Sequence, residues 1–362
     1  MAGDNKNTRV AVAMSGGVDS SVAAVLLKEA GYDVIGITMA LWSCHKGETA
    51  RKKTCCSLTD VQDARAVCER IGIPHVVADY RTEFREKVID HFVSEYKQAR
   101  TPIPCIGCNQ YFKFERLWQT AHEEYGAEFI ATGHYARIAD NGSRSLLKGR
   151  DTHKDQSYFL FVMTPEQLRH SLFPVGGLTK AEVREIAARH GLATAEKIES
   201  QEICFVPDND YAGFIEDYYP EAVGAPGAFV DQDGSVIGRH RGTHAYTIGQ
   251  RRGLGVAVGE RQYVTAIDPV NGQVKLGREE ELYRAGLTAT GMNWIVDLPR
   301  EFAANAKIRY KHVPAPCQVR ILDDGATLVD FTEPQRAITP GQAVVFYDGD
   351  TVLGGGWIER AV

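Results

Sequence analysis

The fold is decided by the stretch Ser15-Gly-Gly-Val-Asp-Ser-Ser21, which lies between an apolar run and an amphipathic run. Residues 8–14, before the stretch, are apolar and β-branched, as is typical of a buried strand. Residues 21–30, after it, have the periodicity of a helix and end at Gly31. Residues 33–41 again have the composition of a strand. These elements make one βαβ unit, so the sequence predicts a parallel sheet whose ligands lie beyond the carboxyl ends of its strands.

The glycine loop has the composition of a phosphate-binding site. Gly16 and Gly17 let the backbone turn sharply, so that successive N–H groups and the amino end of the helix can hold an anion. The loop lacks the Gly-Lys-Ser/Thr ending of a Walker loop and the wider spacing of the dinucleotide fingerprint. An ordinary glycine-rich turn with a serine cap is the alternative, but the residue types and their location favour a phosphate site.

The alternation of strands and helices continues to about residue 207, and capping boxes of Thr164 with Gln167 and of Thr179 with Glu182 predict the starts of two of the helices. After residue 207, glycine and proline become frequent and the apolar segments shorten. This change predicts an α/β protein with three domains. They are a Rossmann-like parallel-sheet domain over residues 1–207, a small mostly β central domain over residues 208–283, and a C-terminal β-barrel over residues 284–362.

Composition limits the class of protein. The chain has 362 residues, of which 44% are hydrophobic and 24% charged, as in globular proteins of two or three domains. The net charge of −6 excludes a uniformly basic nucleic-acid coat, although a local basic surface remains compatible with it. The sequence has no apolar run of the roughly 18 residues that a membrane span needs, and residues 1–9 are polar. We therefore expect no membrane partner and a cytoplasmic location.

Three of the eight cysteines lie where chemistry is expected. Cys105 and Cys108 follow two prolines, just before a helix expected to begin near Asn109 and to end at Tyr125. The amino end of a helix lowers the pKa of a nearby thiol, and Cys108 is expected to be better placed for this effect than Cys105. Cys204 lies where the α/β pattern ends, so it can belong to a loop of the same domain.

The other five cysteines give a weaker indication of a chemical role. Cys68 and Cys317 fall in helical and strand patterns and are interpreted as core residues. The remaining three cysteines and a neighbouring histidine surround a basic loop, and together they could hold a metal ion. These residues come in adjacent pairs, however, which is an awkward geometry for chelation, so a mobile polar loop is favoured. These residues are Cys44, His45, Cys55 and Cys56.

Further motifs follow the glycine loop in order along the chain. The whole set is Ser15-Gly-Gly-Val-Asp-Ser20, Thr101-Pro-Ile-Pro104 with Cys108-Asn109, Ala131-Thr-Gly-His-Tyr135, Lys154-Asp-Gln-Ser-Tyr-Phe159, Leu172-Phe-Pro-Val-Gly176, Ile203-Cys-Phe205 and Thr247-Ile-Gly-Gln-Arg251. With these motifs the chain resembles one family, the tRNA-specific 2-thiouridylases of bacterial and mitochondrial type. The first motif is shared with pyrophosphate-loop enzymes, which cleave ATP between the α and β phosphates. The resemblance therefore implies that the first domain is of the adenine nucleotide α-hydrolase type.

The resemblance implies a tRNA-uridine 2-sulfurtransferase. ATP would adenylate O2 of the wobble uridine, and sulfur carried as a persulfide would replace that oxygen, giving 2-thiouridine, AMP and pyrophosphate. By match to the family, Cys204 carries the persulfide and Cys108 is the nucleophile that frees the sulfur, and the two finish as a disulfide. Thiol exchange of this kind is chemically consistent. The implied partners are tRNA and a protein that donates persulfide or sulfide.

The binding residues are carried over from the same motifs. ATP contacts are expected from Ala13, Met14, Ser15, Gly16, Gly17, Val18, Asp19, Ser20, Met39 and Gly133, with Asp19 also holding Mg2+. tRNA contacts are expected from Ile103, Pro104, Cys105, His134, Lys154, Asp155, Gln156, Arg309, Tyr310 and Gln342. Residues 235–275 hold six basic and two acidic residues and are a further candidate for phosphate contact, the alternative being a solvated β surface; the basic residues include Arg239, Arg241, Arg251 and Arg252.

One position departs from the family pattern. Where the best-known members have an aspartate three residues before the nucleophilic cysteine, this chain has Cys105. Either Cys105 simply replaces that aspartate, or Cys105, Cys108 and Cys204 hold a [4Fe-4S] cluster that binds sulfide. The persulfide route is favoured, and a structural zinc site or inert thiols are the remaining alternative.

Two other functions compete with thiolation. A pyrophosphate-loop amide ligase would adenylate a carboxylate or small carbonyl, but it would need an amine pocket and no cysteine pair. A tRNA-binding or sulfur-carrier protein that merely retains a nucleotide fold would release no pyrophosphate. Pyrophosphate release that depends on tRNA separates the three.

Overall fold

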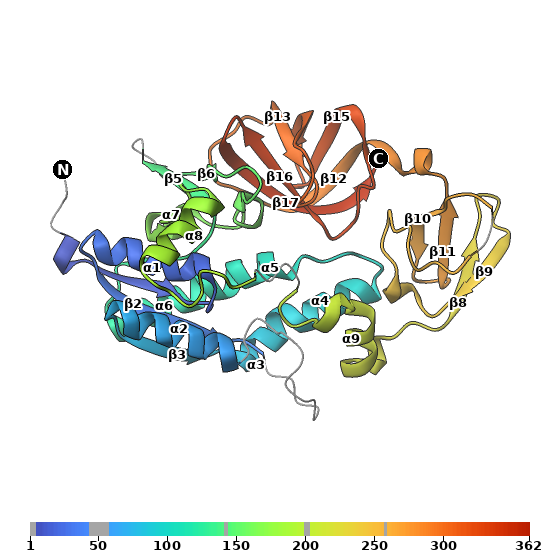
Figure 1. The fold of residues 1–362 in the computed structure, drawn as a ribbon. Helices are drawn as coiled ribbons and strands as arrows, with labels where there is room; N and C mark the ends of the chain where they lie inside the picture. Colours follow the sequence, from blue (N-terminus) through green and yellow to red (C-terminus); the bar gives the residue numbers. More distant parts are fainter. Residues whose placement is uncertain (1–4, 43–57, 141–143, 199–202, 257–258) are drawn as a thin grey trace. The chain divides into compact units, whose positions relative to one another are not determined.

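The computed structural model of the chain describes residues 5–42, 58–140, 144–198, 203–256 and 259–362 (Figure 1). By internal contacts the chain divides into two units. Unit 1 comprises Met1–Val88, Cys105–Asn209 and Gly349–Val352, and unit 2 comprises Ile89–Pro104, Asp210–Asp348 and Leu353–Val362. The two units are described separately. The residue boundaries of the three domains expected from the sequence remain a prediction.

Unit 1 is built on a parallel sheet, which confirms the Rossmann-like expectation. Its strands have the order β3-β2-β1-β4-β7, and every pairing is parallel. The strands are β1 (Arg9–Ala13), β2 (Asp33–Ala40), β3 (His75–Asp79), β4 (Phe129–Ala131) and β7 (Ser171–Leu172). Three successive residues of β1, Val10 to Val12, are fully buried, as expected for a central strand covered on both faces.

Three helices share one apolar core with this sheet. They are α1 (Val18–Glu29), α2 (Leu58–Ile71) and α8 (Lys180–Arg189). Val22 of α1, Val67 of α2 and Ile186 of α8 pack in a single cluster with Val10 and Val12 of β1. Helix α8 begins with the capping box that its sequence predicts, because Thr179 and Glu182 bond each other's backbone N–H groups.

A second capping box, of Thr164 and Gln167, begins α7 (Pro165–Arg169), again as the sequence predicts. Unit 1 also holds an antiparallel hairpin of β5 (Ala136–Asp140) and β6 (Arg144–Lys148). The short η4 (Ser157–Phe159) follows this hairpin.

The helix that carries Cys108 begins earlier than predicted. Helical structure starts with α5 (Pro104–Gly107), passes through a π-helical segment (Cys108–Arg116) and ends with α6 (Leu117–Tyr125). Proline fits the first turn because it lacks the N–H that would be unpaired there. The predicted start near Asn109 is therefore wrong, whereas the predicted end at Tyr125 is confirmed, with Gly126 following at φ +68°.

The first part of unit 2 is helical and then mostly β. It contains α4 (Asp90–Lys97) and α9 (Tyr211–Tyr218), followed by a sheet of order β10-β11-β8-β9. The α4 helix follows α3 (Arg81–Phe84) and a π-helical segment (Arg85–Ile89). The strands are β8 (Gly227–Val230), β9 (Val236–His240), β10 (Tyr263–Asp268) and β11 (Gln273–Gly277).

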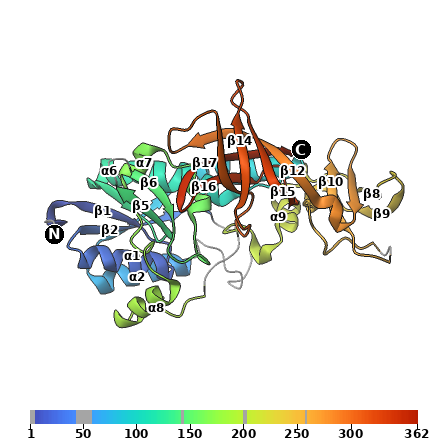
Figure 2. The ribbon, with the colours of Figure 1, turned by 90° about the horizontal axis from the view of Figure 1, so that it is seen from above.

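Six described strands close the C-terminal β-barrel that the sequence predicts (Figure 2). Their order is β12-β15-β14-β13-β16-β17, and β12 pairs with β17 to complete the ring. They are β12 (Tyr283–Trp294), β13 (Glu301–Lys307), β14 (Ala315–Ile321), β15 (Thr327–Arg336), β16 (Ala343–Asp348) and β17 (Thr351–Ala361). Leu287, Val319 and Phe346 are among the side chains that fill the interior. Within the described parts of the chain, no helix has the length and apolar composition needed to cross a membrane.

Candidate active site

The glycine loop joins β1 to α1 at the carboxyl end of the strand, as predicted, and its own serines close it. Ser20 Oγ accepts a hydrogen bond from Ser15 N–H at 3.2 Å, lies 3.1 Å from Ser15 Oγ and donates to the Gly17 carbonyl at 3.1 Å. Gly16 has φ +69°, and a Cβ added there would lie 2.3 Å from the Asp60 carbonyl oxygen. Both the backbone conformation and the space therefore require glycine at this position.

The amino end of α1 is built to receive an anion. Gly17 occupies the N-cap position and has no side chain to bond the first N–H groups of the helix. Those groups, together with the helix dipole, attract negative charge. Gly133, just after β4, closes one side of the loop, since a Cβ there would lie 2.6 Å from Ser20 N and 2.7 Å from the Asp19 carbonyl carbon. The structure thus brings Gly133 and the loop together, as the sequence motifs imply.

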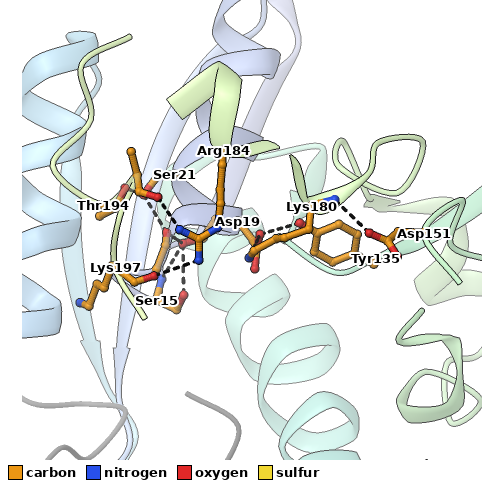
Figure 3. Close-up of polar contacts among 12 residues, drawn as sticks. Ser15, Asp19, Ser21, Tyr135, Asp151, Lys180, Arg184, Thr194 and Lys197 are labelled. Atoms are coloured by element: carbon orange, nitrogen blue, oxygen red, sulfur yellow. Dashed lines mark hydrogen bonds and ion pairs between the residues drawn. The ribbon is translucent and has the colours of Figure 1, made fainter. Parts of the chain in front are cut away.

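Asp19, in the first turn of α1, accepts hydrogen bonds in a cluster of polar side chains that the sequence did not predict (Figure 3). Its Oδ1 accepts hydrogen bonds from Tyr135 Oη and Lys180 Nζ, both at 2.7 Å. Lys180 Nζ also lies 5.7 Å from the centre of the Tyr135 ring. A carboxylate beside a phosphate loop suits Mg2+, which is commonly bound by one or two carboxylates together with substrate phosphates. Asp19 therefore fits the metal role assigned to it.

A second lysine, Lys197, supports the loop from another side. Its Nζ donates to the Gly16 carbonyl at 2.9 Å, to Asp60 Oδ1 at 2.7 Å and to Asp63 Oδ2 at 2.5 Å. Burial lowers the pKa of Lys197, but the hydrogen bonds to the two aspartates outweigh it and leave the pKa above its usual value. Thr194 Oγ1 bonds Ser21 Oγ at 3.2 Å and so ties the same segment to α1 (Figure 3).

Neither lysine was predicted from the sequence, although the sequence carries a signal for one of them. Lys180 is the first residue of α8. A cation in the first turn of a helix is opposed by the helix dipole, and a residue that breaks a local rule often serves a function. Lys197 follows no comparable pattern, because its partners Asp60 and Asp63 come from a distant part of the sequence.

The thiol residues differ in exposure and in their position on the helix. Cys105 is exposed, Cys108 is buried and Cys204 is partly exposed. Because the helix begins at Pro104, Cys105 lies in its first turn and Cys108 lies beyond that turn. The effect of a helix terminus fades within one turn. The expectation that Cys108 is the better placed of the two for that effect is therefore wrong.

An aromatic cluster joins the segments that carry Cys108 and Cys204. The ring centre of Phe84 lies 5.3 Å from that of Phe112, which follows Cys108 by four residues on the same helical segment. The Phe84 ring centre also lies 6.0 Å from that of Phe205, the neighbour of Cys204. All three rings are fully buried. The two segments thus pack on one ring in unit 1.

The three thiols do not form a ligand set for a cluster. In the described parts of the chain, no three His, Cys, Asp or Glu side chains are gathered as metal ligands would be. The alternative in which Cys105, Cys108 and Cys204 hold a [4Fe-4S] cluster therefore does not fit this arrangement, and no chemical step is assigned to such a cluster. The other residues whose types could bind a metal, Cys44, His45, Cys55 and Cys56, lie outside the described residues.

Two other cysteines are core residues, as predicted. Cys68 is fully buried and Cys317 is 3% exposed. Burial raises the pKa of each thiol to about 12, with a further contribution from Glu69 at Cys68.

His134 is a buried residue with a defined protonation state. Its Nε2 lies 3.3 Å from Lys113 Nζ, and its Nδ1 lies 2.7 Å from Thr132 Oγ1. Burial, and then the Lys113 charge, hold the pKa of His134 well below its usual value, so the ring is neutral. Since the ammonium can only donate, Nε2 is the acceptor and Nδ1 carries the proton. Lys113 also donates to Asn109 Oδ1 at 2.9 Å, which links this histidine to the residue after Cys108.

Two of the residues expected to contact tRNA in unit 1 have side chains that bond within the protein. Asp155 is buried, and its Oδ1 accepts from the N–H groups of Gly149 at 2.9 Å and Ser157 at 3.1 Å. Gln156 Oε1 accepts from the Tyr135 N–H at 3.0 Å. These contacts hold the loop in place, and the neighbouring Lys154 is partly exposed.

The other expected tRNA residues lie in unit 2. Gln342 Nε2 donates to the Thr101 carbonyl at 2.8 Å, and Arg309 donates to the Arg336 carbonyl at 2.9 Å. Lys307 Nζ lies 5.5 Å from the centre of the Tyr310 ring. The four arginines named from residues 235–275 as candidates for phosphate contact are exposed: Arg239, Arg241, Arg251 and Arg252. Arg241 lies 3.2 Å from Glu216.

Three family models match the chain. A tRNA methyl transferase HUP domain matches residues 8–208, a tRNA methyl transferase PRC-barrel domain matches residues 212–278, and an aminomethyltransferase beta-barrel domain matches residues 284–358. Two curated relatives are tRNA-specific 2-thiouridylases MnmA. The one from Geotalea uraniireducens is 54% identical over all of this chain and 98% of its own length. The one from Geobacter metallireducens is 54% identical over 98% of this chain and 97% of its own length.

Solved structures give more distant likenesses. A 4-thiouridine synthetase–RNA complex with bound ATP is 17% identical, with a TM-score of 0.34, and the match covers 59% of this chain and 51% of that one. An NMN synthetase from Francisella tularensis is 18% identical, with a TM-score of 0.34, over 53% of this chain and 66% of that one.

Proposed function

Because the chain belongs to the family of tRNA-specific 2-thiouridylases and is a tRNA sulfurtransferase, we propose that it replaces O2 of the wobble uridine of tRNA by sulfur, consuming ATP. The observation that carries this proposal is the geometry of the loop. An uncapped helix amino end, closed on one side by Gly133 and supported by Lys197, adjoins a carboxylate and a second lysine. That combination suits a polyphosphate with its metal ion.

The first step is adenylation of the uridine. The β and γ phosphates lie at the amino end of α1, and the uracil O2 attacks the α phosphorus. The bond between that phosphorus and the bridging oxygen breaks, and pyrophosphate leaves. Asp19 would hold Mg2+, which would supply positive charge to the phosphates when bound. The residues that form the ATP site in this proposal are Ala13, Met14, Ser15, Gly16, Gly17, Val18, Asp19, Ser20, Met39 and Gly133.

The second step transfers sulfur. The terminal sulfur of a persulfide on Cys204 bonds to C2 of the uridine, and the C2–O2 bond breaks, so that the oxygen leaves on AMP. The Cys108 thiolate attacks the Cys204 sulfur, and the S–S bond of the persulfide breaks in favour of a disulfide between the two cysteines. A thiol reductant and a persulfide-donating protein then restore the starting state. The packing of both segments on Phe84 supports this pairing.

The tRNA contacts in this proposal fall into two groups. Cys105, His134 and residues 154–156 belong to unit 1, whereas Ile103, Pro104 and residues of the barrel belong to unit 2. The barrel residues are Arg309, Tyr310 and Gln342. Arg and Lys suit phosphates, and a tyrosine ring suits stacking on an unpaired base.

Pyrophosphate release, measured with and without tRNA, tests the proposed function. We expect release from ATP to require tRNA and to be followed by 2-thiouridine when a persulfide donor is present. Release that requires an amine acceptor and ignores tRNA would assign the chain to the amide ligases. Binding of tRNA without any release would make it a carrier.

The absorbance of the protein distinguishes the two sulfur routes. Anaerobically purified protein should be colourless under the persulfide route. A brown preparation with visible absorbance that is lost in Cys105→Ser would contradict the persulfide route and favour a cluster.

A further inference from the structure

Two partly buried lysines flank the glycine loop, and they are held in different ways. Lys197 bonds the Asp60 and Asp63 carboxylates and the Gly16 carbonyl, so its ammonium supports the loop itself. Lys180 is 12% exposed and its ammonium pairs with Asp19 Oδ1 at 2.7 Å. Asp19 is the carboxylate that the proposed function assigns to Mg2+. Lys180 and the metal ion therefore compete for the same group.

The backbone holds Lys180 beside the loop independently of this ion pair. The Lys180 N–H donates to Asp151 Oδ2 at 3.0 Å (Figure 3). Thr179 caps the helix that Lys180 begins. The helix dipole and burial both oppose a cation at this position, and in this structure Asp19 offsets them. A polyphosphate could offset them equally well, because it brings more negative charge than one carboxylate.

We propose that Lys180 binds pyrophosphate, and that its ammonium is paired with Asp19 until ATP binds. When Mg2+ and ATP bind, Asp19 turns to the metal ion, and the Lys180 ammonium bonds the β phosphate and later the pyrophosphate that leaves. Tyr135 donates to the same Oδ1 at 2.7 Å and keeps the carboxylate oriented during the exchange. This inference rests on the proposed function, because it assumes that the loop binds the phosphates of ATP.

Calorimetric titration of the full chain with pyrophosphate, ATP and AMP in the presence of Mg2+ tests the inference. Lys180→Gln should weaken pyrophosphate and ATP binding by about 10–100-fold, the usual worth of a charge-assisted hydrogen bond. AMP binding should change by less than about twofold, because AMP lacks the β and γ phosphates. A role limited to loop structure would weaken all three ligands together. Lys28→Gln is the matched control, because Lys28 Nζ donates to the Gly72 carbonyl at 2.8 Å at the opposite end of α1.

Removing the metal ion tests the exchange itself. In a chelator, Asp19→Asn should bind pyrophosphate about tenfold more tightly than the unmodified chain, because the ammonium is no longer held by the carboxylate. Most of this gain in affinity should disappear when Lys180→Gln is added. The gain that remains in the double variant measures the loss of repulsion between the Asp19 carboxylate and pyrophosphate. With Mg2+ present, Asp19→Asn should instead bind pyrophosphate more weakly.

The outcomes separate the inference from the proposed function. Equal pyrophosphate affinity in Lys180→Gln and the unmodified chain, or a parallel loss of AMP binding, would overturn the role of Lys180 even if tRNA is thiolated. The expected losses in a chain that binds ATP but never modifies tRNA would support Lys180 and refute the proposed function. A chain that binds neither ATP nor pyrophosphate would overturn both.

Discussion

Replacing Gly16 by alanine should damage the loop in a way that the structure allows to be calculated. Gly16 has φ +69°, a conformation that costs an L-residue about 1–2 kcal/mol. The added Cβ would lie 2.3 Å from the Asp60 carbonyl oxygen, whereas Cβ contacts under 3.0 Å are essentially never seen, so the backbone must separate by about 0.7 Å. Overpacking of this kind costs about 1–3 kcal/mol more. We therefore expect a loss of about 2–5 kcal/mol in the free energy of unfolding.

Gly31 provides the matched control, because it separates conformational strain from collision. It has φ +85°, and nothing lies within 4 Å of an added Cβ. Gly31→Ala should therefore lose only about 1–2 kcal/mol and should bind ATP like the unmodified chain. Gly16→Ala should in addition bind ATP about tenfold more weakly, because the displaced N–H groups no longer fit the phosphates.

Urea unfolding and calorimetric ATP titration of the two variants check this reasoning. The larger loss of stability and the loss of ATP affinity should both appear in Gly16→Ala and not in Gly31→Ala. Equal unfolding midpoints for the two variants, with unchanged ATP affinity in both, would refute the assignment of residues 15–20 as the phosphate loop.

Three further predictions concern other parts of the chain. Cys108→Ser should abolish thiolation of tRNA, whereas tRNA binding, measured by filter retention, should persist. Cys317→Ser, which changes a buried cysteine of the barrel, is the control and should keep its thiolation activity. A Cys108→Ser variant that still thiolates tRNA would refute the sulfur assignment. Because the buried His134 has a pKa well below the usual 6.5, the unfolded chain takes up the proton first as the pH falls. The free energy of unfolding, measured with urea, should therefore decrease as the pH is lowered below about 6.5. This residue should contribute up to ~1.4 kcal/mol per pH unit, and His134→Gln should remove that contribution. Arg100→Met should lower the free energy of unfolding by about 2 kcal/mol, because the Arg100 side chain is 19% exposed and bonds two glutamates at 2.9 and 3.0 Å. Breaking the exposed pair of Arg320 and Glu301 should cost under about 0.5 kcal/mol, and equal losses for the two pairs would contradict the weight given to burial.

Local signals in the sequence predicted much of the fold. The apolar run before Ser15 gave a buried central strand, and the capping boxes at Thr164 and Thr179 began helices as expected. Each of these signals depends on residues within a few positions of one another. The alternating pattern after residue 208 likewise predicted the C-terminal barrel, because strand periodicity is a local property.

What the sequence did not predict depends on distant residues or on competing local rules. Lys197 contacts Asp60 across 137 positions, and Arg100 contacts Glu359 across 259 positions, and no local pattern indicates such partners. The helix that carries Cys108 begins at Pro104, because a proline that looked like a loop residue also suits the first turn of a helix. Exposure was also hard to judge, since Asp155 is polar yet its carboxylate is buried among N–H donors.

The central claim is that AMP carries away the oxygen that sulfur replaces. It is tested most directly with a tRNA transcript whose wobble uridine bears a heavy oxygen isotope at O2, incubated with the chain, ATP, Mg2+ and a persulfide donor. Mass spectrometry should find the heavy isotope in the phosphate of AMP, in an amount equal to the 2-thiouridine formed. Recovery of the isotope in water or in unmodified uridine, with AMP unlabelled, would contradict the claim.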